Sequence, residues 1–218
     1  MAEHTLDWLC AAAAEMAAEM AAEMAVEVAA ASEGAGGEGA GGEGAGGEGA
    51  GAAPSLLELY CGNGNHTVAL ARHFGRLLAV EIDPRLVEAA EHNLAQNGVT
   101  TASVLCAPSA RFCGGLLRKL SGAAAGARGA AEGARSADRY DALLVDPPRA
   151  GLDQTTLSLV QKFEQVLYIS CSPATLRENL RASGLEDTHV VRKFALFDHF
   201  PYTPHLECGV WLARRCKE

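Results

Sequence analysis

Short apolar runs alternate with amphipathic segments from residue 55 almost to the end of the chain. Each run is bounded by turn-forming residues, which is typical of buried β-strands. The amphipathic segments between the runs predict helices, and Pro84 and Pro173 suit first helical turns. The predicted strands are residues 56–60, 77–81, 103–106, 142–145, 166–170, 190–196 and 209–213. The predicted helices cover about 66–74, 84–96, 109–120, 154–162 and 173–181.

Strands that alternate with helices predict βαβ units with right-handed crossovers, and therefore a Rossmann-like α/β fold with a mostly parallel sheet. No helix separates the last two predicted strands, so an antiparallel strand is expected at the C-terminal edge. In such sheets ligands bind beyond the carboxyl ends of the strands. Candidate chemistry is therefore expected in the segments 60–66, 81–83, 106–109, 146–149 and 170–173.

The first 53 residues differ in composition from the rest of the chain. Residues 11–28 repeat A-A-E-M with a period of four, and these residue types favour a helix, expected over about 5–30. A period of four drifts around a helix with 3.6 residues per turn, so the Met stripe is expected to leave any single core. We therefore interpret the repeat as an expansion of low structural value, with a methionine-rich binding helix as the alternative.

Two further segments have low complexity. Residues 33–51 repeat E-G-A-G-G, and glycine at this density predicts a disordered linker over 33–53. Residues 121–139 predict a solvated insertion within the domain. The expected organisation is an acidic N-terminal segment, 1–53, followed by a catalytic α/β domain, 54–218.

The formal net charge of −9 argues at first against a nucleic-acid partner. However, the first 53 residues hold ten acidic residues and no Lys or Arg, which leaves 17 acidic and 18 basic residues for the rest. The domain is therefore close to neutral, and a polyanionic partner stays possible. No run of 18 apolar residues occurs, so no membrane span is predicted.

The seven cysteines form no C-x-x-C pair and no Cys/His spacing of the zinc type, so no metal site is predicted. Most lie in apolar runs, which indicates buried, reduced thiols in a cytosolic type of compartment. The first residues have neither a basic signal-peptide start nor an Arg-rich transit sequence. A cytoplasmic location is expected, with an organelle left open.

The first candidate site is the turn after residues 56–60, where Gly62 and Gly64 form G-x-G and lead into a helix. Glycines allow a sharp bend and a close approach of the backbone to a ligand. Glu81 ends the next predicted strand, where a carboxylate accepts hydrogen bonds from a ribose. Thr67 stands where a dinucleotide fingerprint has its third glycine, which argues against a pyrophosphate. The alternative is an ordinary turn followed by a surface Glu.

The second candidate site is Asp146, which follows an apolar strand and precedes two prolines. The prolines fix the backbone and so hold the carboxylate at the sheet edge. Asp-Pro-Pro at this strand is typical of methyltransferases that act on planar nitrogen or carbon targets. The alternative is a Pro-Pro loop with an Asp cap.

Two further sites lie near the C-terminus. Cys171 follows an apolar strand and precedes a helix, and a helix N-terminus favours the nucleophilic thiolate. A proline-bracketed loop offers Tyr202, His205 and Glu207, of which Glu207 is the candidate general base. The alternatives are a buried, inert thiol and a structural hairpin with one surface acid.

With these residues in view, residues 55–212 resemble the S-adenosylmethionine-dependent RNA (uracil-C5)-methyltransferases, above all those that make 5-methyluridine in the T-loop of tRNA. The resemblance implies a class I methyltransferase sheet, S-adenosylmethionine as cofactor, the T-arm of tRNA as partner, and a monomer. It implies that Cys171 is the nucleophile and Glu207 the proton acceptor. It implies cofactor contacts from Tyr60, Gly62, Gly64, Asn65, Glu81 and Asp146. The motifs that carry it are LLELYCGNGN, DPPRAGLD, LYISCSPATL and FDHFPYTPHLECGV.

Family members carry an RNA-binding β-barrel and a Q-P-N segment ahead of the sheet, whereas residues 6–9 here resemble the helix just after that segment. The chain is thus expected to begin within the domain, and a truncated or degenerate, non-catalytic relative is the alternative. A cytosine-C5 or amino-nitrogen methyltransferase is a third interpretation. Cytosine enzymes usually have Pro-Cys where Pro147 and Pro148 stand, and nitrogen enzymes need no Cys171.

Overall fold

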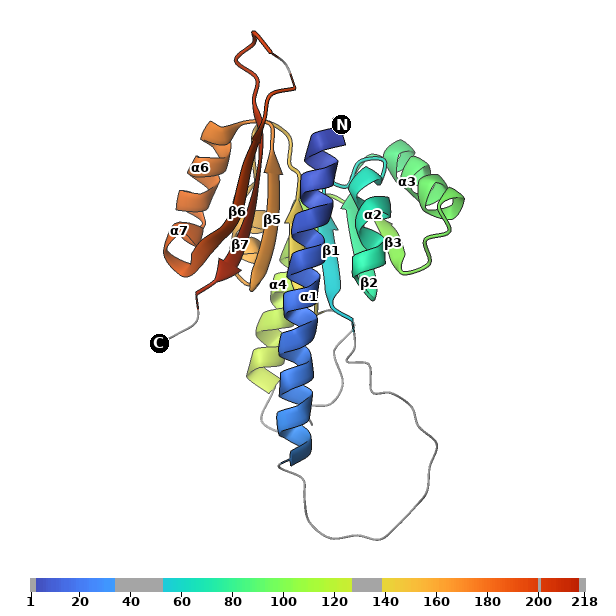
Figure 1. Cartoon of the computed structure of the whole chain (residues 1–218), viewed down its shortest axis with the longest axis vertical. Coiled ribbons are helices and arrows are strands. Elements are labelled where there is room, and N and C mark those ends of the chain that lie inside the picture. The colour runs from blue at the N-terminus through green and yellow to red at the C-terminus, as the bar shows by residue number, and fades with distance from the viewer. Residues whose placement is uncertain (1–2, 34–52, 127–138, 200, 216–218) are drawn as a thin grey trace.

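The computed structural model describes residues 3–33, 53–126, 139–199 and 201–215. A single twisted sheet lies between two layers of helices, as Figure 1 shows. The strands are β1 Ser55–Leu59, β2 Arg76–Glu81, β3 Ala102–Cys106, β4 Ala142–Val145, β5 Gln165–Ser170, β6 His189–Phe197 and β7 Glu207–Arg214. All seven predicted strands are present, each within two residues of its predicted ends.

The strand order is β3-β2-β1-β4-β5-β7-β6. The first five strands pair in parallel, and β7 pairs antiparallel with both β5 and β6. The predicted α/β class with a mostly parallel sheet and an antiparallel C-terminal edge is therefore confirmed. The antiparallel strand β7 is the inner member of that edge pair, and β6 is the outermost strand.

Helices cover both faces of the sheet (Figure 1). The helices are α1 Glu3–Glu33, α2 Asn65–Leu70, α3 Pro84–Gln96, α4 Ser109–Gly126, α5 Gln154–Val160, α6 Pro173–Ala182 and α7 Leu185–Thr188, with a short 3-10 helix, η1, at Ala71–His73. Asp83 and Ser172 cap α3 and α6, and a proline opens each of these helices. The short α7 has no counterpart among the predicted helices.

Each face of the sheet has its own hydrophobic core. On one face, alternate residues of the strands pack against α4, α5 and α6, with Tyr168 and Leu143 among the fully buried side chains. On the other face, Leu56, Leu144 and Trp211 pack against α1 and α2. Successive side chains of a strand point to opposite faces of the sheet, so the same strands contribute residues to both cores.

The N-terminal repeat is a structural part of the second core, so the interpretation of low structural value is wrong. Met16 is fully buried and Met20 is 6% exposed. The Met stripe drifts by only about 40° per repeat, which is less than the width of a buried helix face. Leu9 and several alanines complete that face. The buried residues of α1 in this core are Leu9, Ala12, Ala13, Met16, Ala17 and Met20.

The predicted insertion at 121–139 begins later than expected, because α4 continues to Gly126. The rest of it, residues 127–138, lies outside the described residues, as does most of the predicted linker, residues 34–52. Within the part of the chain that the structure describes, no helix has the length and apolar character needed to span a membrane.

Candidate functional site

The turn after β1 has the backbone conformation that the G-x-G pattern predicts. Tyr60, Gly62 and Gly64 have φ angles of 65°, 57° and 79°. A Cβ at Gly62 would meet nothing within 4 Å, so this part of the turn faces open space. A Cβ at Gly64 would lie 3.0 Å from the Cβ of Ala90, so the second glycine permits close packing of α2 on α3. One glycine is thus available to a ligand, and the other serves packing.

Glu81 is tied to this turn by backbone groups. Its Oε2 accepts a hydrogen bond from the N–H of Gly62 at 3.0 Å. Its Oε1 accepts from the N–H groups of Ile82 at 2.8 Å and Asp83 at 3.0 Å. The side chain is 8% exposed, so it is not an ordinary surface acid. Its carboxylate is fixed at the carboxyl edge of the sheet before any ligand arrives.

Asn65 is the first residue of α2 and is exposed beside this turn. The preceding residue, Asn63, uses its carbonyl oxygen to accept from Nδ2 of Asn93 on α3, at 2.9 Å. Asn65 is therefore an exposed residue directly after a turn that α3 holds in place. Tyr60, Gly62, Gly64, Asn65 and Glu81 therefore come together as the sequence predicts, while their contact with a cofactor stays a prediction.

A buried group of titratable side chains lies beneath the turn, and sequence reasoning missed it. Glu58 is 1% exposed, and its Oε2 accepts from the hydroxyl of Thr67 at 2.7 Å. Its Oε1 has no hydrogen-bond partner among the residues that the structure describes. Nδ1 of His66 lies 4.0 Å from Oε1 of Glu58 and 3.8 Å from Oδ2 of Asp146. The position of Glu58 within an apolar strand was the one feature of the sequence that indicated a buried acid here.

Burial sets the charge of this group. It raises the pKa of Glu58 to about 8 and lowers the pKa of His66 to about 4. Burial also raises the pKa of Asp146 to about 7, and the negative charge of Glu207 adds to the rise. At neutral pH Glu58 is therefore mostly protonated and His66 is neutral. Asp146 is the member whose charge changes near neutral pH.

Cys171 and Glu207 lie opposite each other at the end of one antiparallel strand pair. Ser170 of β5 pairs with Cys208 of β7, so Cys171 and Glu207 are the next residues along the pair. The thiol of Cys208 donates to the carbonyl of Ser170 at 3.5 Å, which closes the pair at this point. Ser172 then begins α6 by accepting from the N–H of Thr175 at 3.3 Å. Cys171 is thus held between the end of a strand and the start of a helix.

The other described thiols have different surroundings. Burial raises the pKa of Cys113 and of Cys208 to about 11, and it also raises the pKa of Cys61. These thiols stay protonated at neutral pH, as expected of buried, reduced cysteines. Cys171 is half-buried and stands at the carboxyl edge of the sheet. No disulfide occurs among the described cysteines.

Glu207 has two side-chain partners that sequence reasoning missed. Its Oε2 accepts from the hydroxyl of Thr5 at 3.0 Å and lies 3.1 Å from Nε2 of His199. His205, the alternative base on the same loop, is instead exposed, and its Nδ1 lies 2.5 Å from a guanidinium nitrogen of Arg149. His199 belongs to the motif FDHFPYTPHLECGV, but Thr5 comes from α1 and carried no signal.

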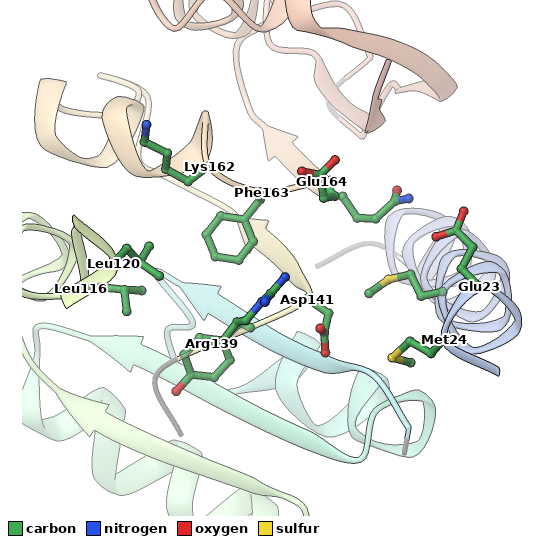
Figure 2. A pocket seen from close by; sticks show the side chains of 12 residues that line it. Glu23, Met24, Leu116, Leu120, Arg139, Asp141, Lys162, Phe163 and Glu164 are labelled. Atoms are coloured by element: carbon green, nitrogen blue, oxygen red, sulfur yellow. The ribbon is translucent and has the colours of Figure 1, made fainter. Parts of the chain in front are cut away.

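A separate hollow of about 270 Å³ lies at the opposite edge of the sheet, where β4 and β5 begin. Figure 2 shows Met24 of α1 on one side of it, with Phe163, Leu116 and Leu120 across the opening. The hollow contains none of the candidate site residues. Among the side chains that the structure describes, no group of three or more His, Cys, Asp or Glu could hold a metal ion.

Solved structures share this architecture. Over 72% of this chain and 34% of its own, the tRNA (uracil-54, C5)-methyltransferase of Pyrococcus abyssi, solved with S-adenosyl-L-homocysteine, superposes with a TM-score of 0.54 and 24% identity. The precorrin-6y C5,15-methyltransferase of Geobacter metallireducens superposes with a TM-score of 0.50 and 12% identity, over 74% of this chain and 80% of its own. The fold is therefore that of the Rossmann-like methyltransferases.

Sequence comparison identifies the family. A family model described as tRNA (uracil-5-)-methyltransferase matches residues 49–215. Proteins named tRNA/tmRNA (uracil-C(5))-methyltransferase from Actinobacillus pleuropneumoniae and Shewanella baltica are each 46% identical over 73% of this chain. The chain belongs to the tRNA (uracil-5-)-methyltransferase family. It spans 42% of the length of these relatives.

Proposed function

We propose that this protein transfers a methyl group from S-adenosylmethionine to C5 of a uridine in tRNA, in the T-loop. The observation that carries the proposal is the pairing of a half-buried thiol, Cys171, with a carboxylate, Glu207, at the carboxyl edge of a methyltransferase sheet. Relatives at 46% identity are named for uracil-C5 methylation. The pairing favours the uracil-C5 reaction over amino-nitrogen methylation, which needs no thiol.

The cofactor half of the site lies over β1 and β2. Glu81 would accept hydrogen bonds from the ribose hydroxyls, and the open turn at Gly62 would face the cofactor. Tyr60, Gly64 and Asn65 shape this turn, and Asp146 borders it from β4. When bound, S-adenosylmethionine supplies an electrophilic methyl group on a sulfonium sulfur.

The reaction follows from the low nucleophilicity of uracil C5. The thiolate of Cys171 adds to C6, and the electrons of the C5=C6 bond make C5 nucleophilic. C5 takes the methyl group as the bond from methyl to the sulfonium sulfur breaks. Glu207 then removes the proton from C5, the C5=C6 bond re-forms, and the thiolate of Cys171 leaves. The target base has to leave its stack in the RNA loop to reach Cys171.

The test is a trap for the intermediate in this sequence. A Glu207→Gln variant keeps the side-chain shape but cannot take the C5 proton as a carboxylate does, which should slow turnover by about 10²–10⁴-fold. With unmodified tRNA and a radiolabelled methyl donor, it should accumulate a methylated protein–RNA adduct on a denaturing gel. Mass spectrometry should locate the adduct at Cys171.

Glu178→Gln is the matched control, because Glu178 is an exposed acid on the neighbouring helix α6. It should turn over as the wild type does. Normal turnover by Glu207→Gln without an adduct would show that another group takes the proton. Absence of methyl transfer by the wild-type chain would favour the alternative, a non-catalytic relative that keeps the fold.

A further inference from the structure

Three side chains from distant parts of the chain meet behind the edge that carries Cys171. The hydroxyl oxygen of Thr5 lies 2.6 Å from Nε2 of His199 and 3.0 Å from Oε2 of Glu207. Nε2 of His199 lies 3.1 Å from the same carboxylate oxygen. We call this group of Thr5, His199 and Glu207 the carboxylate clamp.

One assignment of protons satisfies all three contacts. The Thr5 hydroxyl donates to Oε2 of Glu207, so its oxygen can accept from a proton on Nε2 of His199. Nε2 of His199 also lies within ion-pair distance of Oε2, beside the hydrogen bond from Thr5. Thr5 is fully buried, whereas His199 and Glu207 are 14% and 21% exposed. The Thr5 hydroxyl and the His199 imidazole both contact Oε2, and no hydrogen bond to Oε1 occurs among the described residues.

The surrounding packing holds these groups in place. The ring of Phe197 stacks on His199 with 5.8 Å between centroids, and Trp8 meets Phe197 edge-on at 6.0 Å. Trp8 also lies directly on Gly209, two residues after Glu207, where an added Cβ would be 2.4 Å from the indole ring. The first turns of α1 therefore fit against the two strand ends that carry His199 and Glu207.

Further along, α1 is anchored by both apolar and charged contacts. Beyond the buried methionines, Glu15 pairs with Lys193 and Glu19 pairs with Arg192, the latter at 2.6 Å. Both basic residues belong to β6, the strand that leads to His199. The position of Thr5 is thus set by the whole length of docked helix.

We propose that Thr5 and His199 are positioning residues that orient the Glu207 carboxylate for proton removal from C5. This inference rests on the proposed function. With Oε2 in contact with both Thr5 and His199, Oε1 is the oxygen left to take the proton. The C5–H electrons re-form the C5=C6 bond and the thiolate of Cys171 departs, so a misaligned carboxylate slows this step and spares the methyl transfer before it.

The test separates this step from binding. Thr5→Val removes the hydroxyl at nearly constant volume, and a misplaced catalytic group can cost about 10²-fold in rate. In single-turnover assays with unmodified tRNA and S-adenosylmethionine, release of methylated RNA should fall about 10–100-fold, while KM and the rate of methyl incorporation stay near wild type. Thr5→Ser should restore release. Glu23→Gln, at an exposed acid of the same helix away from the clamp, should behave as wild type.

A second measurement does not need activity. In ¹⁵N-histidine-labelled protein, the hydrogen-bonded Nε2–H proton of His199 should give a slowly exchanging NMR signal, assigned by its loss in His199→Gln. Thr5→Val should abolish that protection from exchange, and Thr5→Ser should keep it, in samples whose melting shows a folded domain. This signal reports the clamp itself.

The outcomes distinguish the two proposals. Wild-type release by Thr5→Val would overturn the clamp and leave the methyltransferase proposal standing, as would an unchanged His199 signal in that variant. If the wild-type chain transfers no methyl group, the methyltransferase proposal fails. Loss of the His199 signal in Thr5→Val would then still support the clamp, and its persistence would overturn it.

Discussion

The carboxylates of Glu81 and Glu207 stand at the same edge of the sheet, but different groups hold them. Glu81 accepts from three backbone N–H groups, none more than 19 residues away in sequence. Glu207 is held by two side chains, and Thr5 lies 202 residues before it. The proposed cofactor half of the site is thus built locally from the backbone, whereas the proposed catalytic half depends on tertiary packing. Most substitutions of Thr5 or His199 remove a side-chain partner of Glu207, whereas only proline removes a backbone N–H that holds Glu81.

The largest expected effect is a loss of methyl transfer without any loss of cofactor binding. Cys171→Ser should lower methyl transfer by at least about 10³-fold, because it removes the nucleophile of the covalent step. Cofactor affinity, measured by calorimetry, should stay unchanged because the turn after β1 does not involve Cys171. Cys106→Ser, at an exposed thiol, is the control. Methylation by Cys171→Ser at a near wild-type rate would mean that the nucleophile is misassigned.

A change in α1 should weaken the catalytic half through packing. Met16→Ala should cost about 2–4 kcal/mol of unfolding free energy, since Met16 is fully buried in the core under α1. Met24→Ala should cost less than about 1 kcal/mol, because Met24 borders an open hollow (Figure 2). Denaturant titration checks both values. Effects below about 1 kcal/mol for both variants would show that the repeat contributes no specific packing, and that residues 11–53 could be deleted without loss.

Cofactor binding at the turn after β1 should depend on Glu81. Glu81→Ala should weaken S-adenosylmethionine binding by about 1.5–3 kcal/mol, the cost of losing hydrogen bonds to a charged acceptor. Titration calorimetry would register this as about a 10–150-fold rise in Kd. Glu88→Ala, an exposed acid on α3, should bind as wild type does. Unchanged binding by Glu81→Ala would remove the ribose-binding assignment.

The smallest effect concerns the buried Glu58 between the two halves. Its pKa is raised by burial from 4.5 to about 8, so the folded protein keeps a proton that the unfolded chain releases between those values. The free energy of unfolding therefore falls as pH rises through this range. Glu58→Gln should flatten that dependence and make the fold more stable than the wild type at pH 8. Denaturant titrations at pH 5, 6.5 and 8 measure it, and parallel curves for the two proteins would contradict it.

The part of the site around Glu81, which is built from local backbone contacts, was also the part that the sequence predicted well. The apolar runs predict the strands. The turn that joins Gly62, Gly64 and Glu81 can also be predicted from the sequence, because its contacts lie within one βαβ unit. Burial of Glu58 and His66 is a consequence of packing from both sides, which a strand pattern does not reveal. For α1, the period of the methionines was a poor guide, because alanines between them completed the buried face.

Cys171 and Glu207 were identified as individual residues, and their opposition follows from strand register. The pairing of Ser170 with Cys208 depends on β7 lying antiparallel beside β5, inside the edge. Thr5 was unpredictable for a simpler reason: a Thr in the first turn of a helix is ordinary until the helix docks. The contact of His199 with Glu207 could not be predicted either, because it forms where the docked Thr5 lies beside both residues.

The distance along the chain between Thr5 and Glu207 also bears on when the molecule becomes competent. Contacts of long sequence separation form late, since a large loop must close before they contribute. During synthesis the cofactor half, residues 58–146, emerges from the ribosome well before β7. A nascent chain that has formed β1 to β4 could therefore fold the turn after β1 before β7 is available to pack against α1. The carboxylate of Glu207 would then be the last part of the candidate site to be set in place, because its position depends on β7.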